Sequence, residues 1–398
     1  AMGSGHLRTM AFARYLPALG WDPIVLSARA LAYPRTAPLD DESIPPGCVV
    51  HRALALDAQR HFGVAGKYPG ILAQPDRWGS WWLAAVCQGL RLIRRHRVRA
   101  IWSTYPIMTA HCIAHTLSQI AGLPWIADFR DPVSGSVSRE NPYAFASQQR
   151  WEQRVMSRAA RVVFTTPGAL GACAERFPQA HAQGRLAVIG NGYDERAFAG
   201  IPGPAPSRDD KPLVMVHSGF LYPDGRDPMP FFKALAQLKA TDHVDASKLR
   251  IVLRASGSEA TYARQLQQLG LTDMVDLAAP VSNRQALVEQ AQADALLLFQ
   301  GSRFDRQIPA KVYEYLRVGR PVFALVGEQG DTAALLHTTG GAELAPIDDT
   351  DLIARRLLTF IDALRGNRGP RADPNIVAGL SRREGATLLA RVLDQASA

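Results

Sequence analysis

The sequence lacks the features that mark disulfide-rich, zinc-binding and membrane-spanning proteins. Its 398 residues include four cysteines and no Cys-x-x-Cys pair; they are Cys48, Cys87, Cys112 and Cys173. This pattern predicts neither a disulfide framework nor a zinc site and is typical of a reducing compartment. No apolar run reaches the roughly 18 residues that span a bilayer, and no signal peptide is apparent. We therefore expect a cytoplasmic protein, at most bound peripherally at the inner face of the plasma membrane.

Charge patterning narrows the class of partner. The formal net charge is +9, which favours anionic partners such as nucleotides, nucleic acid or acidic lipid headgroups. No run of lysine and arginine with interleaved aromatic residues occurs, so we expect no nucleic-acid partner. A predicted helix ends in a basic cluster at 91–97. The cluster predicts either a solvated helix end that complements the dipole or peripheral contact with an anionic membrane surface.

The length and the element pattern predict two domains. A chain of 398 residues exceeds one ordinary core, and alternating strand and helix patterns in both halves indicate parallel α/β sheets. A proline-rich passage separates the halves. We predict an N-terminal domain at 1–198, a linker at 199–211 and a second domain at 212–378. A last segment, 379–398, is expected to form a helix that crosses back to the first domain.

The first domain opens on a glycine-rich turn rather than on a strand. Gly3-Ser4-Gly5 enters a helix, which is where backbone N–H groups gather and anions bind. Such a turn normally follows a strand, so the first strand is apparently missing from this sequence. Arg8 stands where a dinucleotide fingerprint needs a third glycine. Residues 30–79 are rich in proline and glycine without periodicity, which predicts an insertion or a mobile loop.

The stretch 307–325 carries the strongest local signal. Pro309 can begin a helix and Gly319 can end it, and an apolar run of the kind seen in doubly covered strands follows. Lys311 and Glu314 are three residues apart, so both project from the first turns on one side. A carboxylate there can accept both hydroxyls of a ribose, and an ammonium near a helix N-terminus suits a phosphate. A surface ion pair is the alternative.

A charged group closes the predicted strand 124–128. Asp128, Arg130 and Asp131 lie at its carboxyl end, where ligands bind in open α/β sheets. A buried structural Asp–Arg pair is the competing interpretation.

Two α/β domains, the Asn191-Gly192-Tyr193-Asp194 entry to the linker and the 307–325 block together resemble the GT-B glycosyltransferases. The likeness is strongest to the family-four retaining enzymes, which use nucleotide-activated sugars. It covers Gly3-Ser4-Gly5 with its helix, residues 127–132, residues 190–194 and residues 213–345. The resemblance implies two doubly wound Rossmann-like domains that face a cleft, which is the GT-B architecture.

The resemblance also implies a donor site. Glu314 matches the family glutamate that holds the donor ribose, and Arg226 and Lys311 take the basic positions that neutralise the diphosphate. The implied donor-binding residues are Glu314, Lys311, Arg226, Gly219, Gly5 and Thr332. Such enzymes generally need no metal ion or cofactor, because helix N-termini and basic side chains stabilise the departing diphosphate.

The implied reaction is retaining transfer of a hexose-type sugar from a nucleoside diphosphate to a glycan or lipid-linked acceptor. Arg130 would stabilise charge near the donor and Asp131 would orient the sugar or the incoming hydroxyl. Asp128 is expected to hold Arg130 in place, because a buried unpaired guanidinium is costly.

Two further candidates lie on the acceptor side. His111 could act as a base or could simply be packed or solvated. Trp78, Trp81 and Trp82, with Arg77, could form a platform for a sugar or lipid, or could anchor the core.

Departures from the family pattern keep other functions open. Arg306 stands where the family often has a second glutamate, and Phe220 replaces a basic residue beside the glycine that opens the second domain. Arg130 fills a position often held by histidine. The alternatives are a nucleotide-sugar epimerase or hydrolase and a non-catalytic nucleotide-sugar-binding scaffold with the same fold.

Overall fold

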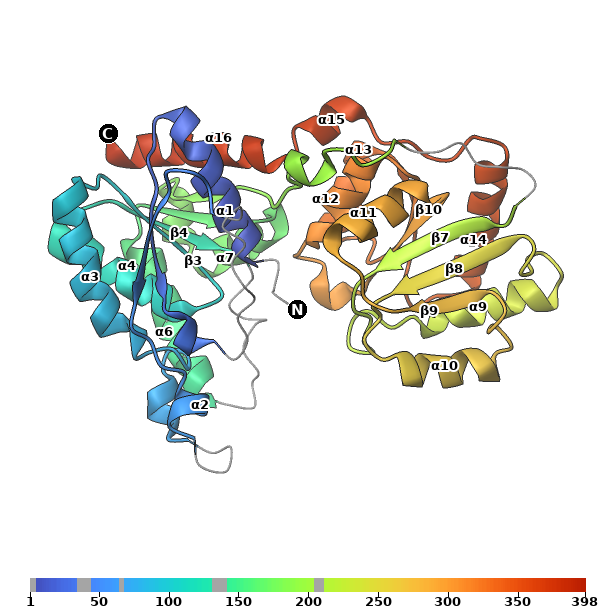
Figure 1. Ribbon diagram of the computed structural model, residues 1–398, viewed down its shortest axis with the longest axis horizontal. Coiled ribbons are helices and arrows are strands. Elements are labelled where there is room, and N and C mark those ends of the chain that lie inside the picture. The colour runs from blue at the N-terminus through green and yellow to red at the C-terminus, as the bar shows by residue number, and fades with distance from the viewer. Residues whose placement is uncertain (1–4, 34–43, 64–67, 131–141, 204–210) are drawn as a thin grey trace. The chain divides into compact units, whose positions relative to one another are not determined.

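The computed structural model describes residues 5–33, 44–63, 68–130, 142–203 and 211–398 (Figure 1). The chain divides into two compact units. Unit 1 combines Ala1–Gly190 with Arg382–Ala398, and unit 2 is Asn191–Ser381. The divisions therefore fall after Gly190 and Ser381, whereas the sequence pattern predicts them near 198 and 378. Among the described helices, none is long and apolar enough to cross a bilayer.

Unit 2 is built on one six-stranded parallel sheet with the order β12-β11-β10-β7-β8-β9. Its strands are β7 (Leu213–Ser218), β8 (Leu249–Arg254), β9 (Val275–Ala278), β10 (Ala295–Gln300), β11 (Val322–Val326) and β12 (Ala342–Ala345). Counted within the unit, this is the 3-2-1-4-5-6 order of a doubly wound sheet. The strand order reverses between β7 and β10, and ligands of such sheets bind at the carboxyl ends of the strands at that point.

Helices cover both faces of the unit 2 sheet (Figure 1). They are α9 (Met229–Ala240), α10 (Glu259–Gln268), α11 (Asn283–Gln292), α12 (Ala310–Val318), α13 (Asp331–Thr339), α14 (Thr350–Arg365) and α15 (Pro374–Ala378), with the 3₁₀ helices η5 (Glu195–Phe198) and η6 (Ser302–Phe304). Phe231 and Leu357 belong to one buried cluster and Val312 and Leu336 to another. Burial on both faces explains why β11 is apolar at every position.

Unit 1 contains a four-stranded parallel sheet with the order β3-β4-β5-β6 and a separate parallel pair, β1-β2. The strands are β1 (Ile24–Ala28), β2 (Val49–Ala53), β3 (Ile101–Thr104), β4 (Trp125–Phe129), β5 (Arg161–Phe164) and β6 (Leu186–Val188). The helices are α1 (Gly5–Tyr15), α2 (Ala58–His61), α3 (Trp81–His96), α4 (Met108–Ala121), α6 (Pro142–Arg158), α7 (Pro167–Arg176), α8 (Pro178–Ala182) and α16 (Arg382–Ser397), with the 3₁₀ helices η1 (Leu16–Leu19), η2 (Ala30–Ala32) and η4 (Gly70–Ala73).

The last helix belongs to the core of unit 1. Phe12 of α1 packs in one buried cluster with Ile126 of β4 and with Ala386 and Leu389 of α16. In Figure 1 α16, in red, lies beside α1, in blue. The 17 residues after Ser381 therefore complete a hydrophobic core begun by the first 190.

The prediction of an insertion or loop at 30–79 was wrong in part. The described residues of this region include β2, which pairs in parallel with β1, and the short helices η2, α2 and η4. β2 is five residues long, and only Ala53 in it is buried. Such a short, largely polar strand gives almost no hydrophobic period, which is why the pattern did not reveal it.

Candidate active site

Lys311 lies at the carboxyl end of β7, where the strand order of unit 2 reverses. Its Nζ donates to the backbone oxygen of Ser218 over 2.6 Å and lies 3.3 Å from His217 Nε2. Pro309 is the N-cap of α12 and Gly319 ends it at φ +77°, so the predicted helix is confirmed. The start of that helix carries Lys311 to the strand end.

His217 is a completely buried neighbour of this lysine. Its Nδ1 lies 2.9 Å from the backbone oxygen of Leu297. An Nδ1–H that donates there leaves Nε2 as an acceptor for the ammonium of Lys311. Burial, with Lys311 as the next cause, lowers the pKa of His217 well below its ordinary value. The imidazole is therefore neutral and fixes the position of the lysine without adding charge.

A second cation, Arg226, lies close enough to Lys311 to affect its titration. Burial first, and then the charge of Arg226, lower the pKa of Lys311 to about 7, while Glu314 acts in the opposite direction. The Arg226 guanidinium lies over two aromatic rings, with its carbon 5.3 Å from the centre of Tyr222 and 5.6 Å from that of Phe304. Two basic side chains thus lie close together although their like charges repel each other.

Two buried polar atoms at this strand end have no hydrogen-bond partner among the described residues. They are Arg226 Nε and Ser218 Oγ. Buried polar atoms are rarely left unpaired, and an unfilled ligand site is one reason for such an exception. With the neighbouring ammonium, these donors form a place suited to an anion.

Gly219 allows the close approach of Lys311. It has a φ of +119°, and a Cβ at this position would lie 2.8 Å from Lys311 Nζ. Phe220 follows with 55% of its surface exposed, and its ring fills the space where a Cβ on Gly257 would stand. The position where the family has a basic residue is therefore an exposed ring here.

Hydrogen bonds from buried side chains hold the loop between β10 and α12 in place. Gln300, buried at the end of β10, donates to the backbone oxygens of Phe304 and Gln307 over 2.7 and 2.8 Å. Thr332 Oγ1 lies 3.1 Å from Gln300 Oε1 and 3.0 Å from the backbone oxygen of Gln307. The hydroxyl of Thr332 is thus engaged inside unit 2, and its predicted contribution to the donor site is limited to the backbone at the start of α13.

In unit 1, the prediction that Asp128 pairs with Arg130 was wrong. Arg8, not Arg130, forms a two-pronged contact with this fully buried carboxylate, with Nε and Nη2 at 3.0 and 3.1 Å from its oxygens. Arg8 also donates to the backbone oxygens of Gly190 and Ile189 over 2.7 and 2.9 Å. Arg8 stands where a dinucleotide fingerprint needs a third glycine. Its side chain links α1, which begins at Gly5, to β4 and to the end of the first chain segment of unit 1.

Arg130 is directed by other contacts. Its Nε donates to the backbone oxygen of Tyr105 over 2.6 Å, and its own backbone oxygen accepts a hydrogen bond from Thr165 Oγ1 over 2.9 Å. Asp131 lies outside the described residues. Of the predicted trio, the structure thus describes Asp128 as a buried partner of Arg8 and Arg130 as a half-buried side chain on the backbone of Tyr105.

His111 belongs to the core and is not placed as a base. It is completely buried among Tyr105, Trp125 and Phe129, and its Nδ1 lies 2.7 Å from Ser103 Oγ. Burial lowers its pKa to about 3. A neutral, enclosed imidazole has no access to an acceptor, which corrects the acceptor-side prediction.

Sequence reasoning missed the roles of His217 and Arg8. A histidine that ends an otherwise apolar strand was the available signal for His217, because a polar residue at a strand's carboxyl end often faces the ligand edge. No local signal pointed to Arg8, since its partner is 120 residues away.

Comparison with known proteins adds a family match. Residues 4–192 match the family model of the glycosyl transferase 4-like domain. No curated protein sequence matches the chain.

Solved structures share the whole fold. Sucrose-phosphate synthase from Thermosynechococcus elongatus has a TM-score of 0.66 at 16% identity, covering 99% of this chain and 93% of that one. HepE from Anabaena, solved with UDP and glucose, has a TM-score of 0.63 at 18% identity, covering 99% and 96%. The lipopolysaccharide outer core galactosyltransferase WaaB has a TM-score of 0.59 at 12% identity, covering 98% and 96%. At these identities the likeness shows the GT-B fold, which confirms the predicted pair of Rossmann-like domains.

Proposed function

We propose that this chain, which has the GT-B fold and whose residues 4–192 match the glycosyl transferase 4-like domain, is a glycosyltransferase that retains the anomeric configuration and needs no metal ion. The donor is a nucleoside diphosphate sugar and the acceptor is a glycan or a lipid-linked sugar. HepE, one of the similar structures, was solved with UDP-glucose, and we take a uridine nucleotide as the first donor to test.

The observation that carries the proposal is the cationic cluster at the end of β7. Lys311 and Arg226 lie close together, and Arg226 Nε and Ser218 Oγ have no partner within the described part of the chain. A diphosphate would supply acceptors for these donors and would restore the full charge of the lysine. Glu314, three residues further along α12, is proposed to accept the ribose hydroxyls.

The proposed chemistry follows from these groups. As the bond between the sugar and the diphosphate breaks, negative charge grows on the leaving phosphate. Lys311 and Arg226 are held by the protein before the reaction, so they stabilise that charge without reorganisation. A leaving group stabilised in this way lets an oxocarbenium-like sugar form, and the acceptor hydroxyl then attacks the same face. Arg130 and Asp131 are our candidates in unit 1 for the transfer step.

The donor proposal is tested by calorimetric titration of UDP, GDP and ADP and their glucose conjugates. We expect one nucleotide family to bind, and we expect Lys311→Met and Arg226→Met to weaken the diphosphate by about tenfold or more, the scale of a lost charge-assisted hydrogen bond. Lys233→Met, an exposed change on α9, is the matched control. Equal losses with the nucleoside alone would show that the two cations act elsewhere.

Transfer itself is tested with the donor that binds. Proton NMR of the anomeric centre in the product would report retention, and an unchanged rate after exhaustive chelation would support independence from metal. A protein that binds the nucleotide sugar but neither transfers nor hydrolyses it over a broad acceptor panel would be a scaffold instead.

A peripheral membrane contact would suit a lipid-linked acceptor. Arg94, Arg95 and Arg97 are exposed at the C-terminal end of α3. We propose that this end of α3 contacts anionic lipid. Co-sedimentation with phosphatidylglycerol vesicles should fall with added salt and in Arg94→Gln/Arg95→Gln, and binding to phosphatidylcholine alone of equal strength would contradict it.

A further inference from the structure

Unit 1 contains a pocket that is lined by its own residues only, whereas the cationic cluster belongs to unit 2. It has a volume of about 380 Å³ and lies between the segment that leads into α3 and the helices α4 and α6. This volume falls within the range of about 300–1,000 Å³ typical of small-molecule sites. The side chains that decide its chemistry are Trp82, Thr109, Ser147, Arg150, Trp151 and Arg154.

Two of these side chains give the pocket an uncompensated positive charge. Arg150 and Arg154 are four residues apart on α6, so they project from the same side of the helix. Both are exposed, and among the described residues neither has a carboxylate partner. Asp76, on the neighbouring segment, is already engaged, because it accepts hydrogen bonds from the amide and the hydroxyl of Thr109 over 2.7 and 2.8 Å. The charge of the arginines is therefore available to an anionic ligand.

Two indole rings complete the pocket. Trp82 has 41% of its surface exposed while its Nε1 donates to Thr116 Oγ1 over 3.0 Å, so the ring is anchored by its edge. The Arg154 guanidinium lies 4.7 Å from the centre of the Trp151 ring. Flat apolar faces beside donors suit a sugar ring, whose C–H face stacks and whose hydroxyls take hydrogen bonds.

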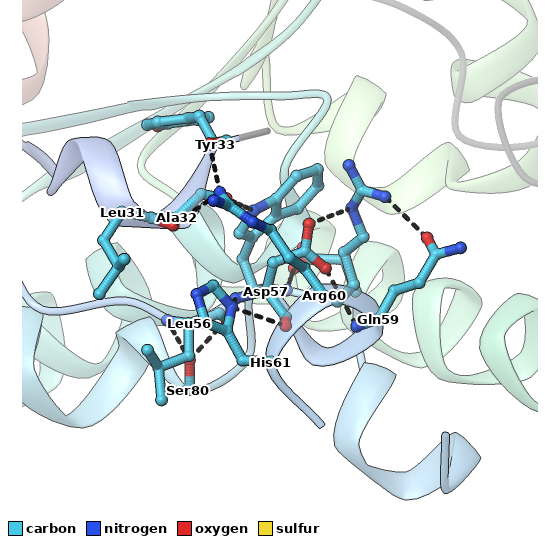
Figure 2. A network of polar contacts seen from close by, with 12 residues as sticks. Leu31, Ala32, Tyr33, Leu56, Asp57, Gln59, Arg60, His61 and Ser80 are labelled. Atoms are coloured by element: carbon cyan, nitrogen blue, oxygen red, sulfur yellow. Dashed lines mark hydrogen bonds and ion pairs between the residues drawn. The ribbon is translucent and has the colours of Figure 1, made fainter. Parts of the chain in front are cut away.

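The wall that carries Trp82 is held in place before any ligand arrives. Figure 2 shows the network around Asp57, a buried carboxylate paired with Arg77 at 3.3 Å. In the same network Ser80 Oγ lies 2.9 Å from both the amide and the backbone oxygen of Leu56. The residue before α3 is thereby fixed to the segment after β2, and Trp82 follows two residues later.

The neighbouring tryptophans have a different role. Trp78 donates from Nε1 to the backbone oxygen of Ala32 over 3.1 Å, and Trp81 is buried in the cluster that includes Ala53 and Val86. These two side chains anchor the wall. Of the three, Trp82 is the one that lines the pocket.

We propose that this pocket binds a sugar that carries a negatively charged group, a phosphate or a carboxylate. Arg150 and Arg154 hold the charged group, and the indoles of Trp82 and Trp151 flank the ring. The same chemistry could come from the acceptor of the proposed reaction or from an acidic sugar that regulates it. Binding in unit 1 does not depend on the proposed function, so the two can fail separately.

The first experiment titrates the intact protein with glucose 6-phosphate, glucuronate, glucose and inorganic phosphate. Tryptophan fluorescence and calorimetry are read together. The two acidic sugars should bind with a saturable fluorescence change, and glucose and inorganic phosphate should each bind at least about tenfold more weakly. The proposal would be overturned if glucose bound as tightly as glucose 6-phosphate. It would also be overturned if neither acidic sugar bound at concentrations up to about 10 mM.

Substitutions in the pocket lining test whether the acidic sugar binds there. Arg150→Gln and Arg154→Gln should each weaken the acidic sugars by about tenfold, and Trp82→Leu should remove the preference for glucose 6-phosphate over inorganic phosphate. Arg158→Gln, on the same helix but outside the pocket lining, is the matched control. All four changed side chains are exposed, and unchanged thermal unfolding checks that the fold is kept. Losses of equal size in the control would overturn the assignment.

Lys311→Met separates this pocket from the donor site. Binding of glucose 6-phosphate should be unaffected by that change and by saturating UDP, and loss in either case would place the sugar in unit 2 and overturn the proposal. Once a donor is known, an acidic sugar that becomes glycosylated is the acceptor. One that changes turnover without being consumed is an effector, and its effect should disappear in Arg154→Gln.

Discussion

Replacing Arg8 with Met tests the role of the buried pair in unit 1. The change keeps an unbranched side chain of similar length and removes the guanidinium. It leaves the carboxylate of Asp128, which is 0% exposed, without its two-pronged partner. Two backbone oxygens, those of Ile189 and Gly190, lose a donor at the same time.

The expected loss of unfolding free energy comes mainly from the carboxylate of Asp128, which is left without a cation. Breaking a buried ion pair from one side costs about 3–5 kcal/mol, because an uncompensated charge stays in the interior. The two backbone oxygens add roughly 0.5–1.5 kcal/mol each. Replacing both partners by apolar residues removes the first cost. Arg8→Met/Asp128→Leu should therefore be about 2–3 kcal/mol more stable than Arg8→Met alone.

The tryptophans make this measurable in one unit. All seven lie in unit 1; they are Trp21, Trp78, Trp81, Trp82, Trp102, Trp125 and Trp151. Urea unfolding followed by their fluorescence reports unit 1, and far-ultraviolet circular dichroism reports both units. We expect the fluorescence midpoint to fall in Arg8→Met while the part of the dichroism transition that belongs to unit 2 stays in place.

Arg91→Met, an exposed change on α3, serves as the control and should change stability by less than about 0.5 kcal/mol. The reasoning would be refuted by an Arg8→Met protein within about 1 kcal/mol of the parent. A double variant no more stable than Arg8→Met would refute the assignment of the cost to the carboxylate.

Three further predictions concern the donor site and the transfer step. Glu314→Gln should weaken UDP binding by roughly 1.5–3 kcal/mol in calorimetry, the scale of a hydrogen bond to a charged group; unchanged affinity with an intact fold would end the ribose assignment. The pKa of Lys311 is lowered to about 7, so the free protein loses this charge as the pH rises through 7. Because diphosphate favours the protonated form, UDP affinity should fall by up to about tenfold per pH unit from pH 7 to pH 9. Lys311→Met should flatten that profile, and a wild-type profile that is already flat would contradict it. Finally, Asp131→Asn should lower turnover by about 100-fold with little effect on donor affinity; near-normal turnover would show that Asp131 takes no part in the transfer step.

The sequence predicted the features whose signals lie in neighbouring residues along the chain. Pro309 and Gly319 bound α12 because one lacks an N–H and the other tolerates a positive φ. The apolar run at Val322–Val326 predicted a strand covered on both faces, and the structure confirms it. These signals need no knowledge of what packs against them.

The rest depends on residues that meet only in the fold. Asp128 could have paired with Arg130, two residues away, or with any distant cation, and the sequence favoured the near one. The structure pairs it with Arg8, because α1 packs against β4, with Phe12 and Ile126 in one buried cluster. His111 illustrates the same limit, since the helical pattern of 108–121 did not reveal that this position faces three aromatic rings.

The division of unit 1 into two chain segments has a consequence for synthesis on the ribosome. Residues 191–381 form a continuous piece whose two ends meet, because Tyr193 and Ser381 form a parallel bridge. Unit 2 can therefore finish folding while the core around Phe12 still lacks Leu389 of α16. Domains generally fold in the order in which they emerge, but here the second unit is complete first, and the first unit waits for the final helix. A released chain that ends at Ser381 should therefore contain a protease-resistant unit 2 and a protease-sensitive unit 1.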